Sequence, residues 1–140
     1  MLGENGALAG MDSGSVFVDH TTASAWWRES SPRKRLNVRS VVDAPVSGGQ
    51  SGAENGCLTV LCGGTNADVS AAEPVMRAYA AQITHFGAVG SGQLAKMVNQ
   101  ICIAGCVQGL AEGLAFGMHA GLDMPNSSRR SPAAQHPLGR

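Results

Sequence analysis

The chain has 140 residues, of which 44% are hydrophobic and 14% charged, and its ten basic residues balance ten acidic ones. This composition predicts one modest core, and the basic residues show no organised face that would indicate a nucleic-acid partner. No uncharged apolar run reaches the roughly 18 residues that cross a bilayer, and the start of the chain lacks a basic region followed by an apolar one. We therefore expect a soluble, cytoplasmic protein with no membrane partner.

Four short runs rich in β-branched, aromatic or other apolar residues predict buried strands. They lie at 15–19, 41–43, 57–62 and 83–86. Polar residues follow the carboxyl end of the first run. Asp43, which ends the second run, is expected to brace the loop that follows rather than to react.

Two helices are expected along the same stretch of chain. One covers about 67–81, with Asn66 or Asp68 as its N-cap and with Pro74 shortening or kinking it. The other covers 92–118, an almost uncharged stretch rich in helix-forming residues. Strands that alternate with helices imply an α/β sheet, followed here by a long helix that leaves it.

Glycines recur at every fourth position of the long helix, which aligns them along one stripe: Gly105, Gly109, Gly113 and Gly117. Each glycine costs the helix about 1 kcal/mol relative to alanine. Another backbone packed against the stripe would account for that cost. We therefore expect a buried helix, either within a larger domain or at a subunit contact. The alternative, in which the glycines have no packing role, stays open.

The four cysteines include no C-x-x-C pair and lie among apolar neighbours: Cys57, Cys62, Cys102 and Cys106. Reduced core thiols are the favoured interpretation, over disulfides or metal ligands. The histidines show no metal-ligand spacing either, so we expect no metal site.

Lys96 and Asn99 lie near the start of the long helix, three residues apart and hence on one face. A glycine-rich loop at 43–49 lies upstream and includes Ser47, Gly48 and Gly49. An ammonium and an amide that face the same small molecule indicate a site that moves a proton. A solvated lysine and an ordinary turn are the structural alternatives.

Several linked motifs, in this order along the chain, resemble the β-hydroxyacid dehydrogenase family (3-hydroxyisobutyrate dehydrogenase and tartronate semialdehyde reductase type). Residues 19–22 are similar to the family's strand-end segment beside the nicotinamide. The substrate-side signature is matched by 42–49, 52–59 and 63–64, and the catalytic G-x-x-x-K-x-x-x-N/K region by 92–100. The resemblance covers 1–25 and 41–124.

This resemblance implies the C-terminal part of a Rossmann-like nucleotide-binding domain, followed by the first long helix of an all-α domain. The implied domains are an incomplete NAD(P)-binding domain at 1–90, an interdomain helix with the start of the helical domain at 91–124, and a disordered tail at 125–140. A homo-oligomer formed through the helical domain is one option for covering the long helix.

The resemblance also implies an NAD(P)-dependent oxidoreductase that transfers a hydride between a nicotinamide cofactor and a small β-hydroxyacid, of the 3-hydroxyisobutyrate or tartronate semialdehyde/glyoxylate type. Lys96 would relay a proton and Asn99 would orient the substrate oxygen. Thr22 would contact the cofactor. The substrate carboxylate would bind the Ser47 hydroxyl and the backbone N–H groups of Gly48 and Gly49.

The sequence departs from the family pattern in one important respect. No G-x-G-x-x-G follows a strand, so neither the pyrophosphate-binding turn nor the choice between NAD and NADP can be identified. We therefore expect an N- and C-terminally incomplete copy that is inactive by itself. A non-catalytic remnant or interaction module is the alternative.

Two stretches, 26–40 and 125–140, look foreign because they hold most of the basic residues. Tryptophan has the single codon TGG, so Trp26-Trp27 reads as Val-Val one nucleotide back when a G precedes it. With GC-rich codons, both stretches shifted in this way give helix-like sequences. The hypothesis is that both are translated out of frame, and the DNA sequence tests it.

Overall fold

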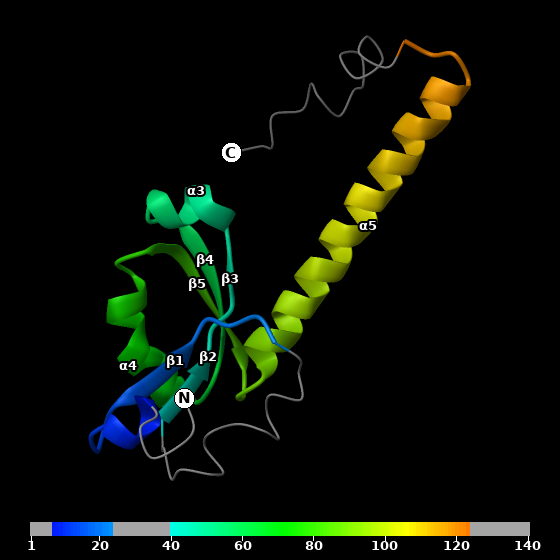
Figure 1. Ribbon diagram of the computed structural model, residues 1–140. Helices are drawn as coiled ribbons and strands as arrows, with labels where there is room; N and C mark the ends of the chain where they lie inside the picture. The colour runs from blue at the N-terminus through cyan, green and yellow to red at the C-terminus, as the bar shows by residue number, and fades with distance from the viewer. Residues whose placement is uncertain (1–6, 24–39, 124–140) are drawn as a thin grey trace. The chain divides into compact units, whose positions relative to one another are not determined.

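The computed structural model describes residues 7–23 and 40–123 (Figure 1). The chain divides into two compact units, Met1–Asn99 and Gln100–Arg140, and the boundary falls within the last helix. The predictions for 26–39 and 125–140, including the disordered tail and the out-of-frame hypothesis, lie outside the described residues. In chain order the elements are η1 Ala7–Gly10, β1 Val16–Asp19, β2 Ser40–Asp43, β3 Val46–Ser47, α3 Gly49–Glu54, β4 Leu58–Gly63, α4 Asn66–Met76, β5 Ala80–Gly87 and α5 Ser91–His119.

The first unit is built on one mixed sheet. β1 pairs with β2 in parallel, from Val16 opposite Ser40 to Asp19 opposite Asp43, and β4 pairs with β5 in parallel. β3 runs antiparallel to β4, and β2 meets β4 at Asp43 and Gly63. The mixed sheet and the long final helix confirm the predicted α/β class, and all four predicted strands are present.

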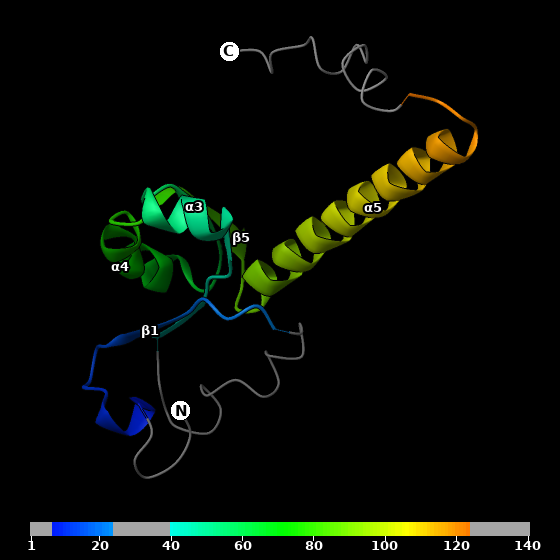
Figure 2. The same cartoon turned by 45° about the horizontal axis from the view of Figure 1, so that its top comes forward.

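The helix α4 covers one face of the sheet and makes the crossover between β4 and β5 (Figure 2). Alternate residues of β4 point to opposite faces. Val60 and Cys62 are buried in the core beneath α4, while Thr59 and Leu61 are only half-buried on the other face. The core therefore lies on the α4 side, and the opposite face is the one that meets the start of α5.

The structure corrects the predicted limits of α4. Its N-cap is Thr65, whose hydroxyl accepts the Asp68 N–H at 3.1 Å, rather than Asn66 or Asp68. The helix ends at Met76, five residues earlier than expected. Pro74 removes one hydrogen bond within the helix. Beyond Met76 the chain turns through shorter-range bonds, from the Ala78 N–H to the Val75 oxygen and from the Tyr79 N–H to the Met76 oxygen, before β5 begins at Ala80.

Three short elements were not predicted: η1, β3 and α3. The segment read from the sequence as a glycine-rich loop forms both β3 and the start of α3. Gly48 and Gly49 join them with φ values of 130° and 61°, which favour glycine. The turn from strand to helix therefore depends on these two residues.

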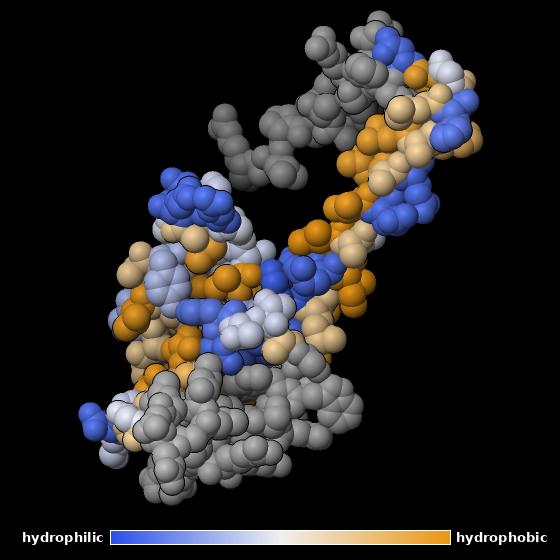
Figure 3. All heavy atoms as spheres, viewed as in Figure 1, coloured by the Kyte–Doolittle hydropathy of each residue, from blue (hydrophilic) through white to orange (hydrophobic). Residues whose placement is uncertain are grey.

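The second half of α5 is exposed in the described part of the chain, whereas the predicted burial, within a larger domain or at a subunit contact, concerns neighbours outside it and stays a prediction. Every residue from Gln100 to Phe116 is exposed, and hydrophobic side chains lie along the helix (Figure 3). Apart from the adjoining turns of the helix itself, no atom of the described residues lies within 4 Å of where a Cβ would stand on Gly105, Gly109 or Gly113. By length and composition alone α5 would also pass for a membrane-spanning helix, a test that core helices of soluble proteins pass too.

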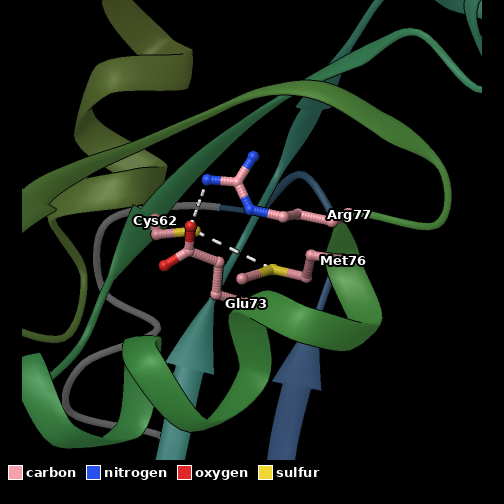
Figure 4. Close-up of polar contacts among 4 residues, drawn as sticks. All are labelled: Cys62, Glu73, Met76 and Arg77. Carbon is pink, nitrogen blue, oxygen red and sulfur yellow. Dashed lines mark hydrogen bonds and ion pairs between the residues drawn. The ribbon is translucent and has the colours of Figure 1, made fainter.

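Only one cysteine is a core thiol, which corrects the prediction made for all four. Cys62 is fully buried, and its thiol donates to Met76 Sδ at 4.0 Å, beside the Glu73–Arg77 ion pair of α4 (Figure 4). The other three cysteines are exposed, and all four are free. Burial, with smaller contributions from the charges of Asp43 and Glu73, raises the pKa of the Cys62 thiol to about 11.

Candidate functional site

The carboxyl end of β2 is tied to the start of α5 by a buried carboxylate. Asp43 has no exposed surface, and its two oxygens accept backbone N–H groups, Oδ1 from Gly90 at 2.6 Å and Oδ2 from Gln93 at 2.9 Å. Burial raises the pKa of this carboxyl, and the hydrogen bonds from Gly90 and Gln93 oppose the rise. Asp43 therefore ties the turn before α5 and the first turn of α5 to the end of β2, whereas the sequence predicted that it braces the loop following it.

Two glycines allow this close approach. A Cβ on Gly63 would lie 2.7 Å from the Gly92 nitrogen and would also meet Asp43 Oδ1. A Cβ on Gly92 would lie 2.6 Å from the Asp43 carbonyl oxygen and would also meet the carbonyl oxygen of Leu61. Real Cβ atoms do not approach backbone atoms this closely, so the junction of β2, β4 and α5 requires glycine at both positions.

The segment after β1 is held to α5 by the side chain of Gln93. Gln93 Oε1 accepts the Ala23 N–H at 2.9 Å, and Nε2 donates to the Thr21 carbonyl oxygen at 2.6 Å. Thr22 lies between these two bonds and is exposed. The proposed cofactor-contacting residue is thus placed beside the first turn of α5.

His20 makes a second connection between the strand ends. Its Nδ1 lies 2.6 Å from the Ala44 carbonyl oxygen, and its Nε2 lies 2.8 Å from the Tyr79 hydroxyl. Because a carbonyl oxygen only accepts, Nδ1 carries the proton, and in the tautomer protonated at Nδ1 alone Nε2 accepts from the Tyr79 hydroxyl. Burial raises the pKa of the Tyr79 hydroxyl, which keeps it protonated as the donor.

Lys96 and Asn99 occupy the next turns of α5. Lys96 is buried, with 9% of its surface exposed, and lies one turn after Gln93. Asn99 lines a cavity of about 710 Å³ on the sheet face opposite α4. The other residues that line this cavity are Ser47, Thr59, Leu61, Phe86, Ser91, Leu94, Ala95 and Val98.

The structure therefore brings together only part of the predicted site. Ser47 and Asn99 both line this cavity, whereas Lys96, Gly48 and Gly49 are not among the residues that line it; Gly48 and Gly49 are exposed. Lys96 is buried and follows Gln93 by one helical turn. Within residues 7–23 and 40–123, no group of three or more His, Cys, Asp or Glu side chains could hold a metal ion.

Sequence reasoning missed the roles of Gln93 and of the His20–Tyr79 pair. Gln93 lies inside the helix-start motif, but its partners are backbone atoms 70 and 72 residues away. A polar residue in the first turn of an apolar helix was the available signal. Nothing in the spacing of residues identifies a backbone partner so distant in the chain.

Comparisons with known proteins agree with this architecture. Residues 1–87 match a family model described as the NAD binding domain of 6-phosphogluconate dehydrogenase. Residues 90–129 match one described as NAD-binding of NADP-dependent 3-hydroxyisobutyrate dehydrogenase. Both descriptions name a nicotinamide cofactor, in agreement with the expectation of NAD or NADP.

Similar proteins carry related names. An uncharacterized oxidoreductase of Shewanella frigidimarina is 57% identical over 88% of this chain and 43% of its own length. A probable 3-hydroxyisobutyrate dehydrogenase-like mitochondrial protein of Arabidopsis thaliana is 42% identical over 88% of this chain and 41% of its own length. The chain thus spans less than half the length of these relatives.

A solved structure supports the same assignment. The 3-hydroxyisobutyrate dehydrogenase of Mycobacterium tuberculosis, determined with L-serine, superposes with a TM-score of 0.74 at 33% identity, over 83% of this chain and 40% of that protein. The match of more than half of the chain to one family model, together with these relatives, shows that the chain belongs to the β-hydroxyacid dehydrogenase family.

Proposed function

We propose that the chain carries the substrate side and the proton-transfer group of an NAD(P)-dependent oxidoreductase. The reaction would transfer a hydride between the nicotinamide and a small β-hydroxyacid, of the 3-hydroxyisobutyrate or tartronate semialdehyde/glyoxylate type. The observation that supports it most is the junction at Gln93. This junction joins the ends of β1 and β2 to the helix turn that precedes Lys96. In open α/β sheets, ligands bind at such carboxyl ends of strands.

Each predicted site residue has a role in this proposal. Lys96 Nζ exchanges a proton with the substrate oxygen, and Asn99 orients that oxygen without adding charge. The Ser47 hydroxyl and the N–H groups of Gly48 and Gly49 bind the carboxylate, where the missing side chains allow close approach.

The described residues fit one end of the cofactor. Thr22 is exposed just beyond the carboxyl end of β1, and its flanking backbone groups are already paired with Gln93. The threonine side chain is therefore available to contact the nicotinamide end, which supplies or accepts the hydride when the cofactor is bound. The sequence contains no G-x-G-x-x-G turn to assign to the pyrophosphate.

A second candidate function is a non-catalytic remnant or interaction module. The exposed apolar residues of α5 favour it, among them Ile101 at 70% and Leu110 at 65% exposure. A second copy of the chain, packed along the helical part, would cover them.

The proposal also includes domain limits of 1–90, 91–124 and 125–140, and a cytoplasmic location without a membrane partner.

Two experiments test the proposal. The 140-residue chain should show no detectable NAD or NADP binding by saturation-transfer NMR and no turnover of hydroxyacids, and tight binding would contradict this expectation. The second experiment uses a chimera, in which residues 7–23 and 40–123 replace the aligned segments of the Mycobacterium tuberculosis enzyme.

The chimera should oxidise a β-hydroxyacid, and Lys96→Ala should lower its kcat/KM by about 10²- to 10⁴-fold, the usual contribution of a general acid or base. Gln82→Ala, on the exposed side of β5, is the matched control and should change kcat/KM less than twofold. A folded chimera that binds cofactor but does not turn over would favour the remnant or interaction module.

A further inference from the structure

Gln93 is buried at the start of α5 with both ends of its side chain in use. It has no exposed surface. A buried amide left without partners is strongly destabilising, so a glutamine in such a place requires specific hydrogen bonds. Here both bonds go to one short segment, from Ala23 N–H to Oε1 and from Nε2 to the Thr21 oxygen.

These two partners determine which way the amide faces. The Ala23 N–H can only donate, and the Thr21 carbonyl can only accept. An ionised glutamate would place an oxygen against the Thr21 oxygen, and methionine would leave both backbone groups without a partner. Glutamine satisfies both groups without a change of protonation.

The backbone of the same residue is held on its other side. The Gln93 N–H donates to Asp43 Oδ2 at 2.9 Å, and Asp43 ends the strand that leads into the Ser47–Gly49 turn. One residue thus connects the segment after β1, the end of β2 and the first turn of α5. Lys96 follows one turn later on the same helix.

We infer that Gln93 is a positioning residue that holds the Thr22 segment in a constant place relative to Lys96. The inference rests on the proposed function, because only a reaction that uses both Thr22 and Lys96 depends on their separation. Without the two side-chain bonds, the segment after β1 moves independently of α5. Gln93 touches neither substrate nor the reacting atoms, and it acts through Thr22.

The full-length chain provides the first test, with no variant needed. The side-chain amide protons of Gln93 should exchange with solvent about tenfold or more slowly than those of the exposed Gln82, because a net hydrogen bond of about 1.4 kcal/mol corresponds to a factor of ten. Heteronuclear NMR measures both in one sample. Equal exchange rates would overturn the inference.

The second test uses Gln93→Met, with Gln82→Met as the matched control. In Gln93→Met the Ala23 amide should exchange about tenfold faster, while the core amides of Val60 and Cys62 keep their protection. The control should change neither. An unchanged Ala23 rate in Gln93→Met would overturn the inference. If Gln93→Met does not fold, the comparison of the Gln93 and Gln82 side-chain amide exchange rates in the wild-type chain decides whether the inference holds.

The chimera separates this inference from the proposed function. Because Ser47 and the two glycines hold the hydroxyacid, Gln93→Met should lower kcat about tenfold, raise the KM for the cofactor and leave the KM for the hydroxyacid within twofold. Full retention of kcat and of the cofactor KM overturns the positioning role alone. Absence of turnover with Gln93 intact refutes the proposed function, and the slow amide exchange of Gln93 then identifies a purely structural clamp.

Discussion

The two parts of α5 differ in what holds them, although both are rich in apolar residues. Between Ser91 and Asn99, three of the nine residues are buried: Gly92, Gln93 and Lys96. Between Gln100 and Phe116, every residue is exposed. The buried residues are thus a glycine and two polar residues, a glutamine and a lysine, whereas the large apolar side chains of this part are exposed to solvent. Backbone approach and hydrogen bonding, rather than hydropathy, anchor this helix within the described chain.

This difference shows that glycine can be required at one end of a helix and only weaken the helix at the other. Gly92 is required because backbone atoms occupy the place of its Cβ, whereas the space beside Gly105 and Gly113 is open. Glycine at the later positions only weakens the helix, unless a partner from outside the described residues approaches it. Substitutions in the two parts therefore test which part is packed.

The largest effect is expected at the anchored end. Gly92→Ala should destabilise the chain by about 3 kcal/mol, because its methyl group would overlap the carbonyl oxygens of Leu61 and Asp43, and overpacking of this kind costs 1–3 kcal/mol or more. Urea denaturation followed by circular dichroism measures the change. A loss below 0.5 kcal/mol would mean that the junction between sheet and helix adjusts easily.

Thiol labelling distinguishes the core from the exposed helix. Cys62 should react with iodoacetamide at least about 100-fold more slowly than the exposed cysteines, since it is buried and its pKa is raised to about 11. Mass spectrometry of labelled peptides reports each site. Protection of Cys102 and Cys106 as well would show that something covers the second half of α5 in solution.

The pH dependence of stability tests the buried carboxylate. Burial raises the folded pKa of Asp43 above its ordinary value, so the folded state binds a proton more readily than the unfolded state. The stability contributed by Asp43 should therefore fall as the pH rises from about 4 through the folded pKa. Relative to Asp43→Asn, the wild-type chain should gain stability between pH 7 and pH 4, as urea midpoints at each pH would show. A loss would mean that the hydrogen bonds from Gly90 and Gln93 outweigh burial.

The smallest effect is expected in the exposed part of the helix. Gly109→Ala should stabilise α5 by about 1 kcal/mol, the difference in helix propensity, because no atom of the described residues beyond the adjoining turns of the helix lies near the new methyl group. Hydrogen exchange of the neighbouring amides in dilute solution measures it. Sedimentation at higher concentration is the companion measurement, since a dimer packed along the glycine stripe would be weakened by the same change.

Much of the site could be predicted from the sequence, because the informative residues are close together in the chain. Lys96 and Asn99 are three residues apart in a helix, and the Ser47–Gly49 turn is continuous. The placement of Lys96 and Asn99 near a helix start is confirmed, whereas the predicted glycine-rich loop is instead a strand-to-helix turn. Ser47 and Asn99 line one cavity whose lining does not include Lys96, and the roles of these residues stay predictions.

The sequence by itself determined the four predicted strands, the long helix and the family, since each is encoded in local patterns or in ordered motifs. Only the tertiary structure showed that α5 is held at one end and exposed at the other. Only it showed that Gln93 joins segments 70 residues apart. The physical reason is that burial and backbone hydrogen bonds depend on which distant segments meet, and residue spacing does not record that.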